Sequence, residues 1–143
     1  MGVVMFVISP DRLPFGDHDT KKLFTSQLER TYKFMTVKTA DAIASQMAKA
    51  GWNSRVEFAM HGEPTMNPNV VEIVETFRQH LPRASLLMLS NGGGLVDDPA
   101  AKIETLFDAG LNTLAVEEYQ NVKLVPKILS KIQPGFRHDF YTY

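Results

Sequence analysis

The sequence predicts an α/β fold of repeated βα units, in which a mainly parallel sheet forms an incomplete TIM-like barrel. Two observations lead to this prediction. Short apolar runs, typical of strands covered on both faces, alternate with segments of helical periodicity, and the connections between them are short. The chain has 143 residues, 44% of them hydrophobic, which suits a single α/β domain over residues 1–143.

Apolar runs of four to six residues predict the strands, at 3–8, 56–60, 85–89 and 113–116. In parallel sheets followed by helices, ligands bind at the carboxyl ends of the strands. We therefore expect the residues that follow the strands to share one face of the domain. These residues are 9–10, 61–65, 90–94 and 117–119.

The predicted helices have readable ends. Thr36 or Thr39 caps a helix that runs to about Ala50 and stops at Gly51. Two further helices start at Asn-Pro or Asp-Pro pairs, because proline suits the first helical turn. These pairs are Asn67-Pro68 and Asp98-Pro99, with Gly110 closing the second of these helices. The last helix is predicted over 122–131, an irregular loop or extra helix over 10–34, and a tail over 134–143.

Composition narrows the classes of function. Lys and Arg total 15 against 16 for Asp and Glu, so no net charge favours nucleic acid or an anionic membrane. No stretch reaches the roughly 20 apolar residues of a membrane-spanning helix. Cysteine is absent, which excludes disulfides, thiolate nucleophiles and cysteine-held iron-sulfur clusters. We expect a cytoplasmic protein whose partner is a small molecule.

The segment 56–68, VEFAMHGEPTMNP, carries the most specific pattern in the chain. It resembles the second strand and following loop of the radical S-adenosylmethionine (radical SAM) family, in which a Gly-Glu-Pro-type loop precedes an Asn-Pro helix start. Asn91-Gly92 resembles the Asn-Gly after the family's third strand. Segment 33–36 resembles the start of its first helix, and the whole resemblance covers about residues 33–120.

The resemblance implies a radical SAM partial-barrel core with a site for S-adenosylmethionine. Glycine lets the backbone approach a ligand, and Pro64 stiffens the turn, so that main-chain carbonyls and the Glu63 carboxylate can accept hydrogen bonds from the methionyl ammonium group. A carboxylate after the fourth strand can accept from the ribose hydroxyls. The cofactor-binding residues implied in this way are Gly62, Glu63, Pro64, Thr65, Asn91 and Glu117.

The sequence departs from the family in two respects. The CxxxCxxC motif that binds the family's [4Fe-4S] cluster after the first strand is missing, so no such cluster is expected. The chain also holds about four βα units, fewer than the family's partial barrel. We expect a truncated or degenerate member that is non-catalytic alone, and whether it is an enzyme stays open.

Two other functions stay open. A metal-dependent hydrolase or lyase would use Asp17, His18 and His61, which the predicted topology brings to one face. A non-catalytic scaffold would bind a partner chain, or a second copy as a homodimer, over the exposed strand edges of an incomplete barrel. The run 92–94 of three glycines lacks the Lys-Ser/Thr of a phosphate-binding loop and is interpreted as a flexible connector.

Overall fold

The strands form one parallel sheet in which their order is the same as in the sequence. The computed structural model describes residues 4–6, 34–59, 62–116 and 124–132. Val56 lies opposite Leu86 on the neighbouring strand, and Met88 of that strand lies opposite Leu114 on the next. The predicted parallel sheet is therefore confirmed. The strands are β1 (Val4–Phe6), β2 (Val56–Phe58), β3 (Leu86–Ser90) and β4 (Thr113–Val116).

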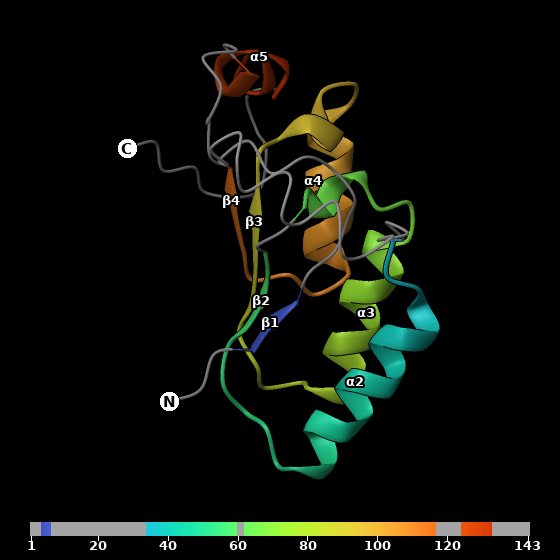
Figure 1. Ribbon diagram of the computed structural model, residues 1–143. Helices are drawn as coiled ribbons and strands as arrows, with labels where there is room; N and C mark the ends of the chain where they lie inside the picture. The colour runs from blue at the N-terminus through green and yellow to red at the C-terminus, as the bar shows by residue number, and fades with distance from the viewer. Residues whose placement is uncertain (1–3, 7–33, 60–61, 117–123, 133–143) are drawn as a thin grey trace, which may run out of the picture.

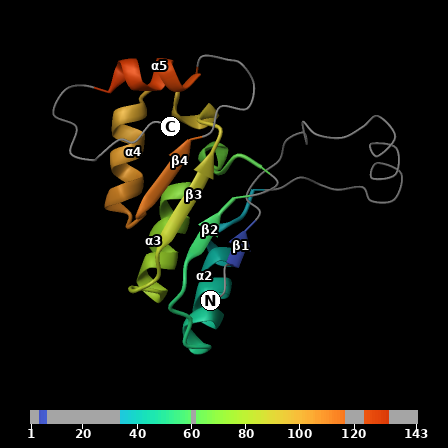
Figure 2. The ribbon, with the colours of Figure 1, turned by 90° about the vertical axis from the view of Figure 1, so that its left-hand side faces the viewer.

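Helices α2 (Val37–Lys49), α3 (Val70–His80) and α4 (Pro99–Asp108) cover one face of this sheet. Figure 1 shows all of them on the same side, and Figure 2, turned by 90°, shows the strands in front of them. Each helix connects two neighbouring parallel strands, and crossovers of one hand put successive helices on the same side. The arrangement is that of an incomplete barrel, as the sequence predicts.

The main core lies between the sheet and helices α2 and α3. Alternate residues of a strand point to the same face, so Val56 and Phe58 of β2 and Leu86 and Met88 of β3 all point into it and are fully buried. Phe77 of α3 meets Phe58 edge to face, with ring centroids 5.3 Å apart and ring planes at 86°. This is a favoured geometry for an aromatic pair, and it fixes α3 against the centre of the sheet.

Helix α2 begins and ends at the residues that its sequence signals indicate. Of the two candidate caps, Thr36 is the one used, because its hydroxyl oxygen accepts from the backbone N–H of Thr39 at 3.2 Å. Gly51 follows the end of the helix with φ of 71°, a left-handed conformation that glycine adopts without strain. Trp52 packs against the main core.

Helix α3 begins later than the Asn67-Pro68 pair predicts. Its first residue is Val70 and its N-cap is Asn69. The side chain of Asn67 is buried, where it donates to the carbonyl oxygen of Met35 at 3.1 Å and accepts from the N–H of Asn69 at 2.9 Å. Asn67 therefore forms a turn and joins this loop to the start of α2, and the helix begins after that turn.

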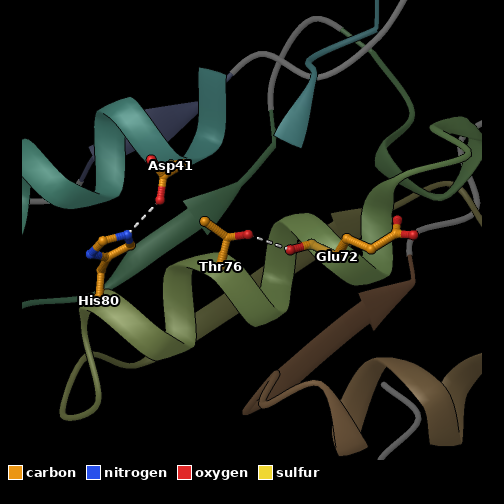
Figure 3. A network of polar contacts seen from close by, with 4 residues as sticks. All are labelled: Asp41, Glu72, Thr76 and His80. Atoms are coloured by element: carbon orange, nitrogen blue, oxygen red, sulfur yellow. Dashed lines mark hydrogen bonds and ion pairs between the residues drawn. The ribbon is translucent and has the colours of Figure 1, made fainter. Parts of the chain in front are cut away.

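A polar contact away from the strand tips also links helices α2 and α3. His80 Nε2 lies 2.7 Å from a carboxylate oxygen of Asp41 on α2 (Figure 3). One turn earlier on α3, the hydroxyl of Thr76 donates to the backbone carbonyl of Glu72 at 2.7 Å. That internal bond lets a polar side chain lie buried on the core side of the helix without an unpaired hydroxyl.

The guanidinium of Arg78 holds the opposite, amino-terminal edge of the sheet. Its five N–H groups make six hydrogen-bond contacts of 2.6 to 3.2 Å, to loop carbonyls and to Asn112 Oδ1, with the two hydrogens of Nη1 shared among three carbonyls. Burial lowers the pKa of this guanidinium. Since the amino-terminal edge of such sheets serves stability, we assign Arg78 a structural role. The acceptor carbonyls are those of Leu81, Pro82, Ala84 and Gly110.

Helix α5 (Leu124–Lys131) lies across the end of the sheet where β3 and β4 finish, as Figures 1 and 2 both show. The sequence predicts its start two residues earlier, at a position outside the described residues. Ile128 of α5 packs with Leu95 and with Ile103 of α4 in a second, smaller hydrophobic cluster. Helix α4 begins as predicted, with Asp98 as its cap and Pro99 in its first turn.

The irregular segment 10–34, apart from Phe34, and the tail 134–143 lie outside the described residues. Their predicted structure, and the extent of the single domain, remain predictions. In the part of the chain that is described, no helix is long and apolar enough to cross a membrane.

Candidate functional site

The loops that follow β2 and β3 meet at the carboxyl edge of the sheet. The first contains the short 3-10 helix η1 (Pro64–Met66), and the second contains η2 (Gly93–Leu95). These short helices contact each other, and Glu63 in the first loop bonds to Ser90 at the end of β3 and to Asn91 in the second loop. The sequence-based expectation that these two loops share one face is therefore confirmed.

The Glu63 carboxylate is the centre of this contact. Its Oε1 accepts hydrogen bonds from the N–H and the hydroxyl of Thr65, the N–H at 3.0 Å, and from the hydroxyl of Ser90 at 2.6 Å. Its Oε2 accepts from the backbone N–H of Asn91 at 2.6 Å. Hydrogen bonds to an ionised carboxylate are roughly twice as strong as those between neutral groups, so Glu63 ties the two loops together.

The two hydroxyl groups extend the contact into the second loop. A hydroxyl has one hydrogen to donate, and Thr65 and Ser90 each direct it to Glu63. Their oxygen lone pairs are then free to accept, from the N–H of Gly94 at 3.1 Å for Thr65 and from the N–H of Gly92 at 2.9 Å for Ser90. The carboxylate thus sets the direction of both hydroxyls.

The glycine run 92–94 is an ordered turn and not the flexible connector that its composition suggests. Gly92 takes a φ of 78°, which starts the η2 turn. The N–H of Gly93 donates to Asn91 Oδ1 at 2.8 Å, so that each N–H of the run is bonded to a side-chain oxygen. A phosphate cradle needs unpaired N–H groups, and the run therefore does not form one.

Two lysines hold the second loop from the far side. Lys102 of α4 donates to the carbonyl of Gly94 at 2.6 Å. Lys131 of α5 donates to the carbonyl of Val96, and to that of Asp97 at 3.3 Å. Helices α4 and α5 therefore support the loop that Glu63 contacts from the β2 side.

Some polar groups of the two loops keep hydrogen-bonding capacity for a ligand. The carbonyls of Glu63 and Pro64 accept from Met66 and Asn67 within the loop itself. For the carbonyl of Gly62, the described residues supply no donor. The side-chain amide nitrogen of Asn91, which is exposed, likewise has no acceptor within the described ranges.

Glu117, and the proposed metal ligands Asp17, His18 and His61, all lie outside the described residues. Among residues 4–6, 34–59, 62–116 and 124–132, no group of three or more acidic or His side chains could hold a metal ion. The metal-site hypothesis therefore stays a prediction.

Ser90 is the member of this arrangement that sequence reasoning did not single out. It ends a strand in which Leu86 and Met88 share its buried face, and it is itself 3% exposed. A hydroxyl at a buried position needs a hydrogen-bond partner. Its place directly after the apolar run 86–89 was the available signal, although the partner, Glu63, is 27 residues away in the sequence.

Comparison with known proteins identifies the fold. No family model and no curated protein matches this chain. The structure is similar to that of BtrN, a radical SAM enzyme, in an open conformation, with a TM-score of 0.62 and 17% identity over 85% of this chain and 51% of BtrN. The complex of BtrN with AdoMet and 2-DOIA gives a TM-score of 0.63 and 17% identity over 76% and 44%.

The fold is radical-SAM-like. At this level of identity the likeness concerns the fold alone. The chain spans about half the length of BtrN.

The residues of this chain do not suit the iron-sulfur cluster that the resemblance to the radical SAM family implies. Cluster iron is held by cysteine thiolates, and the sequence contains no cysteine. The hydroxyl and carboxylate oxygens at the carboxyl edge would be hard ligands for iron, and they are already hydrogen-bonded to one another and to backbone N–H groups. This chain therefore lacks the ligands for cluster-dependent chemistry.

Proposed function

We propose that this chain is a radical-SAM-like domain that binds S-adenosylmethionine, or its demethylated product S-adenosylhomocysteine, without cleaving it by cluster chemistry on its own. The observation that carries the proposal is the pair of loops joined by Glu63, next to which the Gly62 carbonyl lacks a donor among the described residues. An AdoMet complex exists for BtrN, whose fold this chain resembles, and that lends support.

Each proposed contact follows from the chemistry of the group. The ammonium of the ligand needs acceptors, which the Gly62 carbonyl and the second lone pair of Glu63 Oε2 offer. Asn91 offers an amide N–H for a carboxylate or a ribose oxygen. Pro64 and Thr65 shape the turn, and Glu117 is proposed to accept from the ribose hydroxyls.

Titration calorimetry with S-adenosylhomocysteine tests the proposal. We expect saturable binding, and the variant Glu63→Ala should bind about tenfold more weakly because a charged hydrogen-bonding group is lost. Glu75→Ala, on the exposed side of α3, is the matched control and should keep the affinity of the parent protein. Absence of binding heat at millimolar ligand, with the protein shown to be folded, would reject the proposal.

A scaffold function is the second candidate, and one observation favours it. Strand β4 pairs with β3 on one side, and no described strand pairs with its other edge, along which Leu114, Ala115 and Val116 are only half-buried. Unpaired strand edges invite pairing with another chain. We propose that a second copy or a partner chain covers this edge.

Sedimentation over a range of protein concentrations tests the scaffold function. A second copy on the β4 edge predicts a concentration-dependent dimer, which Ala115→Lys should weaken because a charge on an edge opposes strand pairing. Thr105→Lys, on the exposed side of α4, serves as the control for added charge. If the protein is a monomer at every concentration, a second copy does not cover the β4 edge, and only pairing with a different chain remains.

A further inference from the structure

We propose that Glu63 acts as a positioning residue, which sets the relative placement of the two loops through Ser90 and Asn91. This role contributes more to ligand affinity than any direct contact between Glu63 and the ligand. This inference rests on the proposed function and adds the means by which the site is held. It assigns to Ser90 a part in ligand affinity, although Ser90 itself lies too deep to touch a ligand.

The distribution of donors on the carboxylate supports this assignment. Oε1 already accepts from three groups of the protein, so it has no lone pair to offer an incoming ammonium. Oε2 accepts from the N–H of Asn91, which leaves it a single further site. Most of the hydrogen-bonding capacity of the carboxylate is therefore used within the protein.

The groups with spare capacity lie next to the ends of this bridge. Gly62, with its carbonyl, precedes Glu63, and the exposed amide of Asn91 belongs to the residue whose N–H the carboxylate binds. A ligand that uses both groups depends on the distance between the loops. Small displacements in such a site cost affinity, so the bridge determines how well the two groups fit one ligand.

The hydroxyls make the bridge cooperative. Ser90 and Thr65 can accept from Gly92 and Gly94 because Glu63 takes their hydrogens. When the carboxylate is lost, each hydroxyl is free to turn away, and the turn at 92–94 loses two of its side-chain bonds. Ser90→Ala should therefore disturb the same loop that Glu63→Gln disturbs.

Calorimetry with S-adenosylhomocysteine on Glu63→Gln, Ser90→Ala and the double variant tests the inference. We expect Ser90→Ala to bind the ligand about tenfold more weakly than the parent protein. The double variant should lose no more affinity than the single variant with the larger loss, since both changes break one network. Ser130→Ala, on the exposed side of α5, is the matched control and should bind within about twofold of the parent protein. Full affinity in Ser90→Ala together with a loss in Glu63→Gln would overturn the inference in favour of direct contact.

A second pair of variants tests the bridge with a conservative rescue. Thr65→Val keeps the shape of the side chain and removes the hydroxyl, whereas Thr65→Ser keeps the hydroxyl. We expect weakened binding in the first and affinity close to that of the parent in the second. Equal loss in both would contradict the role of the hydroxyl.

Amide hydrogen exchange separates this inference from the proposed function, because it needs no ligand. The N–H of Asn91 should exchange slowly in the parent protein and faster in both Glu63→Gln and Ser90→Ala. If the parent protein binds no S-adenosylhomocysteine, the proposed function fails, and exchange alone then decides on the bridge. Unchanged exchange at Asn91 in both variants would overturn it.

Discussion

Gly94 lies directly against Thr65, at the point where the two short helices of the carboxyl edge touch. Its N–H donates to the hydroxyl oxygen of Thr65 at 3.1 Å, and a Cβ added at Gly94 would overlap the carbonyl oxygen of the same threonine. The obstacle is backbone, which cannot turn aside as the end of a side chain can. The contact therefore requires glycine for space, at a position where φ is not left-handed.

Replacement of Gly94 by alanine should force the two loops apart. We expect a loss of about 1 to 3 kcal/mol in the free energy of unfolding, as in other overpacked sites, measured by denaturant unfolding. Gly93→Ala is the control, since its Cβ would meet only the end of the Asn91 side chain. Equal free energies of unfolding for Gly94→Ala and Gly93→Ala would contradict the close contact between Gly94 and Thr65.

Replacement of Arg78 by methionine should destabilise the fold without changing the site directly. The hydrogen bonds of the guanidinium would be lost and several loop carbonyls left without donors, which we expect to lower the free energy of unfolding by roughly 3 kcal/mol. Arg83→Met, at an exposed position, should change it by less than about 0.5 kcal/mol. Similar unfolding curves for the two variants would contradict the structural role.

Replacement of Asn67 by alanine tests why α3 starts late. The variant loses the bonds to Met35 and Asn69 and leaves a buried gap, so a loss of about 1 to 3 kcal/mol in the free energy of unfolding is expected. The neighbouring Asn69→Ala is a matched control, because the Asn69 side chain makes no capping bond to the helix. Should Asn69→Ala prove the more damaging change, Asn69 would be the residue that organises this turn.

Replacement of Asp98 by alanine should weaken the start of α4. The Asp98 carboxylate accepts from the N–H of Ala101 at 3.3 Å, and loss of such a cap typically costs about 1 kcal/mol, which thermal unfolding can measure. Asp97→Ala provides the comparison, since Asp97 bonds to Lys131 through its backbone carbonyl. Equal melting temperatures for Asp98→Ala and the parent protein would exclude a capping role.

Anaerobic treatment with iron and sulfide should leave no iron-sulfur cluster on the protein, because the sequence offers no thiolate. Elemental analysis after desalting measures this, and stoichiometric iron would contradict the expectation. The same analysis reports on zinc and manganese. A stoichiometric divalent ion lost in His18→Ala or His61→Ala would favour the metal-dependent hydrolase hypothesis.

Local signals in the sequence predicted much of the fold. The apolar runs of β2, β3 and β4, the cap Asp98, the candidate caps Thr36 and Thr39, and the stop at Gly51 are local signals over a few residues, so a single sequence reveals them. The short connections between these segments then favour a parallel sheet, which the structure has.

The candidate site was predicted only in outline. Parallel topology was enough to bring the 62–65 and 90–94 loops to one edge. It did not predict that the Glu63 carboxylate bonds mainly to the protein, nor that the glycine run is a fixed turn. Those features depend on donors that only the folded chain brings near Glu63.

By itself, the sequence determined the succession of strands and helices along the chain, because propensity and capping depend on residues and their near neighbours. Its composition determined the absence of thiolate chemistry. Only the tertiary structure decided that Asn67 serves the start of α2, 32 residues earlier, and that Glu63 joins two loops 27 residues apart. A buried polar group takes whichever partner the packing brings within hydrogen-bond distance, and that partner need not be near it in the sequence.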